Sequence, residues 1–418
     1  MERSILTADR LFDGTGRATI AGPQLHITGQ HIDTRETNLL APPSCSAAVY
    51  AFPGCTILPG LIDTHVHLIF SAKQAHEAVV EQVTGESDAE LAARAIQNAQ
   101  AALRSGITTV RDCGGKGTVI QQVRDAIRNE DIPGPDVISC GVPITTTTGH
   151  CHWLGLTATT PQEVTRAVEQ MLAEDADWLK VMATGGNMTP SPDAMQAQYP
   201  NEVLALIADM GREASKHSAA HVLSRSAMAG VVRANYRTIE HCDWRVDEIH
   251  YEFEPELAVR MLDQNQFVGL TMSGTTRRAL FPEIASLQSP KLTRRLNNRF
   301  VCERQIIDFG LKYTLHSDAG VGRTPIDTFA DGLQAAKIEL RLTPAEILLA
   351  VTRTAAEALD LFDRGTLTAG KLADLVVVDG NPLQDLTALA NIRAVMKAGK
   401  WVAGDIPEKR ETPKPELF

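Results

Sequence analysis

The seven cysteines of this 418-residue chain include no CxxC pair and are odd in number. This pattern argues against a disulfide framework and against a zinc site built from thiolates, so we expect reduced thiols. No run of eighteen apolar residues occurs, and the opening MERSILTADRLFDGTG has no basic segment followed by an apolar one. We therefore expect a cytoplasmic protein that does not bind to a membrane.

Positive charge is also scarce. The chain has 40 lysines and arginines against 51 aspartates and glutamates, which gives a formal net charge of -11. This balance disfavours nucleic acid or an anionic membrane as a partner. The partner that we expect is a small-molecule substrate, and we also expect a homo-oligomer. The length is sufficient for one large catalytic domain with a smaller one attached.

Both ends of the chain have the pattern of short antiparallel strands. In residues 1–59 and 356–418, apolar and polar residues alternate and the runs end at glycine or proline. We expect the two ends to form one small β-sandwich domain together.

Residues 60–355 instead alternate short apolar runs with longer stretches of helical periodicity, which is typical of βα units around a parallel sheet. Eight strand-like runs occur: LIDTHVHL, ITTVRD, DVISCGVPI, DWLKVMAT, SAAHVLS, YRTIEH, QFVGLTM and KYTLHSD. The fold class we predict is α/β, a closed TIM-like (β/α)₈ barrel with the small β-sandwich.

Polar residues late in these runs are informative, because the active site of such a barrel lies at the C-terminal ends of its strands. They are His65, His67, Lys180, His221, His241 and Asp318. The HxH spacing places two imidazoles on one strand face, about 6.5–7 Å apart, close enough to bind one ion. The pair by itself is equally compatible with two buried histidines bonded to backbone carbonyls.

Lys180 allows two interpretations. A lysine near a strand end usually extends to solvent. Among metal ions its ammonium would be repelled, whereas carboxylation by carbon dioxide would give an anionic carbamate that can bridge two cations. Two divalent ions, the carbamate, Asp318, a bridging hydroxide and four neutral histidines would then leave a residual positive charge that polarises a substrate carbonyl.

The chain resembles the metal-dependent amidohydrolase superfamily, in its binuclear branch with a carboxylated lysine. The resemblance is carried by LFDGTG, LPGLIDTHVHL, GITTVRDCGG, TTTGHCHWLG, LKVMATGGNMTP, AAHVLS, TIEHC, LHSDAG and GTLTAGKLADLVVVDGNPL. KVMATGG with GHCHWLG is similar to the subgroup of Xaa-Pro dipeptidases, N-acyl amino acid hydrolases, ochratoxin amidases and imidazolonepropionase-like proteins.

The resemblance implies a role for each of these residues. His65, His67 and Asp318 would hold one metal ion, His221 and His241 the second, and carboxylated Lys180 would bridge them. The ions would be Zn²⁺, or alternatively Mn²⁺ or Co²⁺. A bridging hydroxide would attack an amide bond, with Asp318 as general base and then acid.

Other residues are candidates for contact with the substrate. His150 would donate a hydrogen bond to the substrate carbonyl, or else order its loop. His150 and His152 are also an HxH pair, a rival metal site that the complete ligand set disfavours. A substrate carboxylate would need a cation, and we name Arg225, Arg277, Arg278 and Arg323; His152, Tyr199 and Trp153 are further pocket candidates.

Several departures leave the substrate open. Leu223 stands where the subgroup often has a second histidine, and GLTMSGTTRRAL lacks an expected Pro-Thr pair. Alternatives to a linear amide are a cyclic amide of the imidazolone or hydantoin type, a carbamate or a phosphotriester. A deaminase would need a glutamate after the strand-five histidine, which HVLSRS lacks, and a non-enzymatic barrel would be expected to have lost metal ligands.

Overall fold

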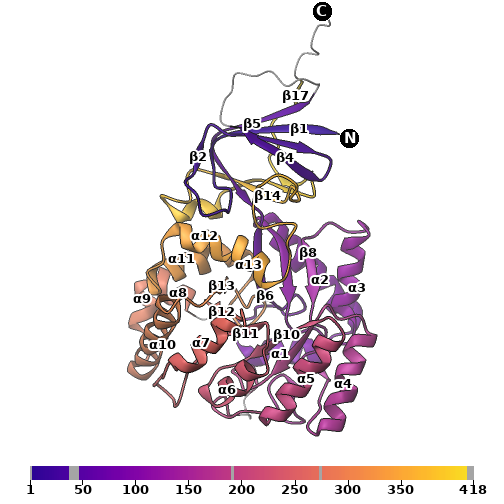
Figure 1. The fold of residues 1–418 in the computed structure, drawn as a ribbon, viewed down its shortest axis with the longest axis vertical. Helices are drawn as coiled ribbons and strands as arrows, with labels where there is room; N and C mark the ends of the chain where they lie inside the picture. Colours follow the sequence, from indigo (N-terminus) through magenta and orange to yellow (C-terminus); the bar gives the residue numbers. More distant parts are fainter. Residues whose placement is uncertain (1, 37–46, 190–192, 273–274, 412–418) are drawn as a thin grey trace, which may run out of the picture.

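The computed structural model describes residues 2–36, 47–189, 193–272 and 275–411. A small β domain containing the first strand, β1, and the last, β17, lies at one end of the long axis. A larger part of helices and parallel strands lies at the other end (Figure 1). No helix in these ranges is both long enough and apolar enough to span a membrane.

The larger part is a barrel of eight parallel strands, each within or overlapping one of the predicted runs. They are β6 (Leu61–Val66), β7 (Ile107–Asp112), β8 (Asp136–Ser139), β9 (Trp178–Met182), β10 (His217–His221), β11 (Thr238–Glu240), β12 (Phe267–Thr271) and β13 (Tyr313–His316). Strands β6–β8 form a three-stranded sheet, and strands β9–β13 form a five-stranded sheet. Backbone hydrogen bonds join the two sheets into a barrel at both edges. The Ile144 amide donates to the Lys180 carbonyl at 2.8 Å, and the Asp318 amide donates to the His65 carbonyl at 2.9 Å. The predicted fold class is confirmed.

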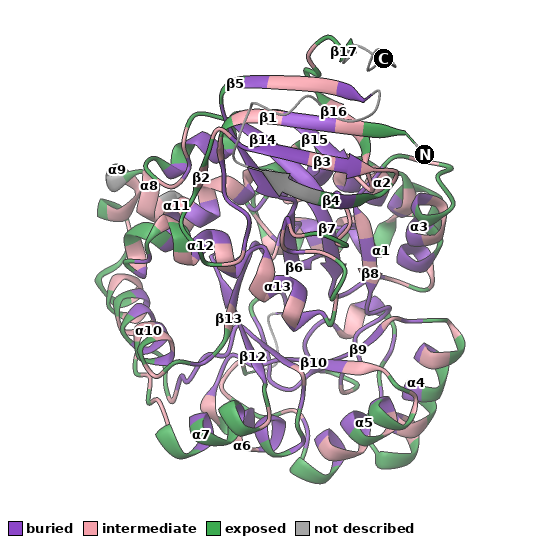
Figure 2. Ribbon diagram, turned by 45° about the horizontal axis from the view of Figure 1, so that its top comes forward, coloured by how far each residue is buried: buried purple, intermediate pink, exposed green. Residues whose placement is uncertain are grey.

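Helices surround these strands, with their outer faces exposed while the strands are buried (Figure 2). They are α1 (His76–Gly85), α2 (Asp88–Arg104), α3 (Val119–Arg128), α4 (Pro161–Ala173), α5 (Asn201–Glu213), α6 (Arg225–Arg233), α7 (Pro255–Asp263), α8 (Thr276–Leu280), α9 (Pro282–Ser286), α10 (Pro290–Asp308), α11 (Phe329–Glu339), α12 (Pro344–Ala350) and α13 (Arg353–Ala358), with short 3₁₀ turns η1 (His152–Leu154), η2 (Ile326–Thr328) and η3 (Leu386–Ala390). Capping boxes fix the starts of α2, α4 and α12, where Ser87, Thr160 and Thr343 each pair with a glutamate three residues later.

The small β domain combines both ends of the chain, as predicted. Its strands are β1 (Arg3–Leu11), β2 (Ile20–Ala21), β3 (Gln24–Thr28), β4 (His31–Glu36), β5 (Ala48–Pro59), β14 (Leu375–Asp379), β15 (Ile392–Lys397), β16 (Lys400–Gly404) and β17 (Arg410–Glu411). Strand β14 shows how the domain meets the barrel. Leu375 and Val377 join the core of the β domain, whereas Val376 and Val378 join the core of the barrel.

The two domain boundaries that we expected can be placed on these elements. The first, between residues 59 and 60, falls between β5 and β6. The second, between residues 355 and 356, falls inside α13, where Ala355, Ala356 and Leu359 pack with the barrel residues Ile62 and Trp178. The helical packing of the barrel therefore extends a few residues past that boundary.

The hairpin between β15 and β16 provides a test of the β domain. Its two turn residues, Ala398 and Gly399, both have positive φ, and a Cβ on Gly399 would lie 2.0 Å from the Gly29 carbonyl oxygen. Gly370 has a similar φ of 82° but open space around it. We expect Gly370→Ala to lower the free energy of unfolding by about 1–2 kcal/mol and Gly399→Ala by a further 1–3 kcal/mol or so. Urea denaturation measures both, and equal losses would contradict the clash.

Candidate metal centre

The centre begins at the end of β6, where the chain turns two imidazoles toward one carboxylate. His65 and His67 are buried, and their Nε2 atoms lie 3.6 Å and 3.3 Å from Oδ1 of Asp318. Asp318 follows β13 with a left-handed φ of 56°, and its backbone amide is bonded to the His65 carbonyl. These three side chains offer ligand atoms within 4.8 Å of one another.

Two further histidines complete the opposite side of the centre. His221 ends β10, and His241 follows β11 with a φ of 65°. Their ring centroids are 4.6 Å apart, and the His241 ring lies 5.3 Å from that of His65. Nδ1 of His241 is 2.7 Å from the Thr271 hydroxyl, an interaction that fixes the ring and leaves Nε2 available as a ligand.

Three of the four histidines are held in the neutral state that metal binding requires. Burial, the largest cause, lowers the pKa of His65, His221 and His241 well below the ordinary value. Burial acts in the same direction on His67, but the hydrogen bond and charge of Asp318 outweigh it and raise the pKa of that ring. Neutral imidazoles have the free lone pair that a metal ion needs.

Lys180 lies in the middle of β9 and lines the same cavity as the four histidines and Asp318. It is 1% exposed, and its Nζ has no hydrogen-bond partner among the described residues. A buried cation without a partner is costly. Its position therefore fits a group that is modified or that contacts an ion when the site is complete.

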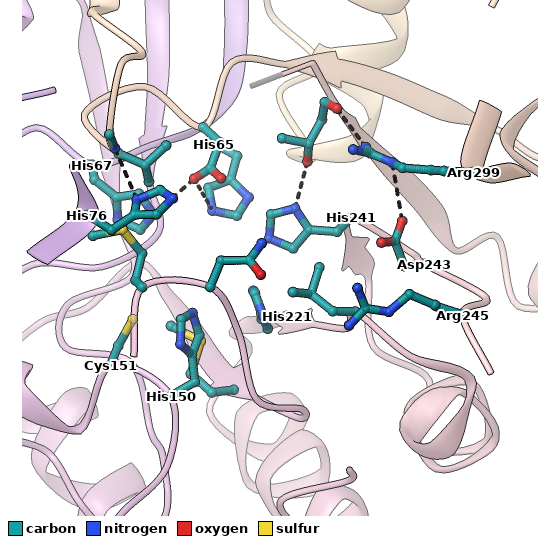
Figure 3. Close-up of a pocket in the computed structure, with 18 of the residues that line it drawn as sticks. His65, His67, His76, His150, Cys151, His221, His241, Asp243, Arg245 and Arg299 are labelled. Atoms are coloured by element: carbon teal, nitrogen blue, oxygen red, sulfur yellow. Dashed lines mark hydrogen bonds and ion pairs between the residues drawn. The ribbon is translucent and has the colours of Figure 1, made fainter. Parts of the chain in front are cut away.

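His150 also faces this cavity, whose volume is about 170 Å³. Its ring centroid is 4.7 Å from that of His221, and its Nδ1 has no partner within the described part of the chain. Burial lowers the pKa of His150 to about 3. Gly186 makes room for this ring, since a Cβ there would lie 2.3 Å from Nε2 of His150. The rings of His150, His221, His241 and His65 surround one space (Figure 3).

A match to one protein family spans residues 56–402. The chain belongs to the amidohydrolase family. The predicted resemblance is thus confirmed, and the protein is a hydrolase that acts on carbon–nitrogen bonds. It is 25% identical over 381 residues to ochratoxinase from Aspergillus niger, covering 83% of this chain and 76% of that protein. It is 27% identical over 411 residues to imidazolonepropionase from Methylobacterium nodulans, covering 90% and 94%.

Solved structures agree in fold. A Xaa-Pro dipeptidase with bound methionine superposes with a TM-score of 0.83 at 24% identity, over 96% of this chain and all of that one. The ochratoxinase of A. niger superposes with a TM-score of 0.82 at 22% identity, over 100% and 99%. These neighbours share the barrel and the small β domain.

The substrate-contact candidates of this amidohydrolase fall mostly outside the cavity. Arg225 pairs with Glu252 and Glu254 at the start of α6, and Arg323 donates to the Gln74 carbonyl at 2.7 Å. The Tyr199 hydroxyl donates to the Ala158 carbonyl at 2.6 Å. These three side chains pair within the protein and do not line the cavity. Their contact with a substrate stays a prediction.

The remaining candidates are placed as follows. Nδ1 of His152 lies 2.9 Å from the Gly149 carbonyl, and the ring does not line the cavity. Arg278 pairs with Glu339, and Nε1 of Trp153 donates to the Thr189 hydroxyl. The side chain of Arg277 lies outside the described residues.

Instead, three arginines that our sequence analysis missed line the cavity: Arg245, Arg295 and Arg299. Arg245 follows His241 by four residues, and the other two lie one turn apart on α10. A search for basic residues four positions beyond a strand-end ligand would have found the first of them. The helical pair has no comparable signal in the sequence.

Our sequence analysis also missed a buried carboxylate, that of Glu240, which holds the ring of His65 in place. Glu240 accepts from Nη2 of Arg111 at 2.5 Å through Oε1, and its Oε2 lies 2.9 Å from Nδ1 of His65. Arg111 holds the pKa of Glu240 down, at about 2, against the opposing effect of burial. His316 stacks on His65, with centroids 4.7 Å apart, and Gly269 leaves the space that its ring occupies.

The Arg111–Glu240 pair gives a stability prediction. Both side chains are fully buried, so Arg111→Met or Glu240→Gln alone leaves an uncompensated group and should lower the free energy of unfolding by about 3–5 kcal/mol. The double variant removes both and should lose clearly less than the sum. Urea denaturation of the four proteins tests the coupling, and strictly additive losses would refute it.

Proposed function

We propose that the protein is a binuclear metal-dependent amidohydrolase that cleaves a linear amide bond, as in a dipeptide or an N-acyl amino acid. The observation that carries this proposal is the meeting of six potential ligands at one cavity, where the buried Nζ of Lys180 has no hydrogen-bond partner among the described residues. A cyclic amide of the imidazolone type is the alternative, supported by the relatives named imidazolonepropionase. A cytoplasmic homo-oligomer remains our prediction for location and assembly.

The residues present suit two divalent ions, with Zn²⁺ proposed and Mn²⁺ or Co²⁺ as alternatives. His65, His67 and Asp318 would hold one ion, His221 and His241 the other, and Lys180, carboxylated by CO₂, would bridge them. Bound there, the ions would polarise the scissile carbonyl and lower the pKa of a water molecule.

Two side chains would then move or hold protons. Asp318 faces the cavity between the two imidazoles of β6, so its carboxylate is placed to take a proton from the attacking water and deliver it to the leaving nitrogen. His150, neutral because burial lowers its pKa, would donate a hydrogen bond to the carbonyl oxygen as negative charge develops there.

The lysine assignment is tested by Lys180→Ala. We expect this variant to lose at least one of the two ions and to lose about 10²–10³-fold or more in kcat, as when one electrostatic stabiliser of a reacting carbonyl is removed. Protein expressed with zinc and bicarbonate would be assayed on libraries of N-acyl amino acids and dipeptides, with metal content measured by mass spectrometry. Lys337→Ala, on the exposed face of α11, is the matched control.

Short-chain carboxylates such as acetate should partly restore Lys180→Ala, since they replace the missing anion. A variant that stays fully active with two ions would rule out the carbamate. Failure of the wild-type protein to turn over any amide would reject the proposed function itself.

His150 gives a separate prediction. His150→Ala should lower kcat by about 10²–10³-fold with a smaller change in KM, because the lost hydrogen bond strengthens in the transition state. Metal content should stay constant, and His150→Gln, which retains a donor, should lose less. The control is His217→Ala at the opposite end of β10 from His221. Unchanged kcat with a lowered melting temperature would indicate that His150 only orders its loop.

A further inference from the structure

The cavity wall beyond His241 and His221 is rich in positive charge. Arg245 comes from the loop after β11, and Arg295 and Arg299 come from one face of α10. Figure 3 shows Arg245, Arg299 and Asp243 beyond the two metal-binding histidines, on the side away from His67. In a protein with a net charge of -11, such a wall is an exception.

One of these arginines is compensated within the protein. Nε of Arg299 lies 2.8 Å from Glu303 and 3.5 Å from Asp243, and its Nη2 donates to the Thr271 carbonyl at 2.7 Å. Burial raises the pKa of Asp243, and it raises that of Glu303 to about 7. Both carboxylates are therefore in contact with Arg299, and their raised pKa values mean that they are protonated more readily than exposed carboxylates.

The other two arginines are not in contact with a carboxylate of the described residues, although the positive charge of both acts to lower the pKa of Asp243. Within the described residues, neither Arg245 nor Arg295 has a carboxylate in ion-pair contact, and the only hydrogen bond recorded for the Arg245 side chain is from Nε to the sulfur of Met195, at 2.8 Å. Arg245 is nevertheless only 8% exposed. A guanidinium is always charged and presents a fork of donors that matches a carboxylate. A carboxylate of a ligand would give Arg245 the ion-pair contact that Asp243, which is in contact with Arg299, does not provide.

The rest of the lining limits what that ligand can be. Met188, Leu223, Leu296 and Val321 give the cavity apolar wall on either side of the polar residues. A ligand that fills it has an apolar group, a reacting centre near the histidines and a negative charge near Arg245 and Arg295. A neutral phosphotriester or carbamate would leave both guanidinium groups without a partner.

We propose that Arg245 and Arg295 bind a free carboxylate of the substrate, so that the substrate class is an apolar N-acyl amino acid or dipeptide. This proposal rests on the proposed function, because it names the substrate of the same site. Leu223, which stands where the subgroup often has a histidine, is then part of the apolar wall.

The substrate class is tested with matched pairs that differ only at the carboxylate. N-acetyl amino acids and dipeptides with apolar side chains would be compared with their C-terminal carboxamides on the zinc-loaded protein. We expect kcat/KM to favour the carboxylates by at least about 10²-fold, since two charge-assisted contacts are lost in the carboxamide. Equal rates would overturn the carboxylate site but leave amide hydrolysis standing, whereas no turnover of either member would reject the proposed function.

The two arginines are tested by Arg245→Met and Arg295→Met. Each should raise KM for carboxylate substrates by about 10-fold or more with little change in kcat, because the contact exists in both ground and transition states. The carboxamides should be hardly affected. Arg294→Met is the control, on the neighbouring exposed position of α10 and outside the cavity lining.

Two readouts do not depend on turnover. Calorimetry should show that N-acetyl-L-leucine binds the metal-free wild-type protein more tightly than the two variants, and that N-acetyl-L-leucinamide does not distinguish them. The melting temperature should hold or rise in Arg245→Met, because the variant removes a buried charge that is not in ion-pair contact with a carboxylate of the described residues. A variant that weakens both ligands equally, or that melts well below the wild type, would assign the arginine a structural role and overturn the proposal.

Discussion

The carboxylate of Glu240 connects the interior of the barrel with the metal-binding face. One of its oxygens is bonded to Arg111, which is fully buried, and the other to Nδ1 of His65. Because Nδ1 is occupied in this way, Nε2 of His65 is the atom left to face Asp318. The position of the first ligand therefore depends on a charge pair in the interior, which joins Arg111 of β7 to Glu240 of β11.

The charges of the site divide along the cavity. Near β6 and β9, four imidazoles lie around Lys180 and Asp318, and burial favours the neutral form of three of them, His65, His221 and His241. Beyond His241, the balance is positive, because Asp243 and Glu303 contact Arg299, and no carboxylate among the described residues is in ion-pair contact with Arg245 or Arg295. The two ends thus differ in what they attract, since one offers ligand lone pairs to cations and the other offers donors to an anion.

The parts of this arrangement that follow the chain locally were predictable from the sequence. Barrel strands are short apolar runs, and a polar residue late in such a run must face the open end, so His65, Lys180 and His221 could be named in advance. The directions of side chains in the loops and helices beyond the strand ends could not be predicted in this way. Arg225 begins α6 and turns outward to two glutamates, while Arg245 is brought to the cavity by a loop whose first two residues, His241 and Cys242, have left-handed φ.

The positions of Arg295 and Glu240 depend on contacts between residues that are far apart in the sequence. Arg295 faces the cavity because Leu296 and Phe300 bury the adjoining face of α10, a contact with no local signature. In the sequence, Glu240 is a charged residue in an apolar strand. Its role is apparent only from its ion pair with Arg111, which lies more than a hundred residues earlier in the chain.

Backbone strain coincides with the proposed ligands. His241 and Asp318 both have left-handed φ, a conformation that costs a residue with a side chain about 1–2 kcal/mol. Such strain persists only where the surroundings hold it, and here Thr271 fixes the ring of His241 while the His65 carbonyl fixes the backbone of Asp318. Each of these two conformations costs stability, and each directs a side chain from the end of a different strand into the cavity. Ions bound at the proposed centre would offset that loss, so occupancy of the centre and stability of the barrel would be thermodynamically linked.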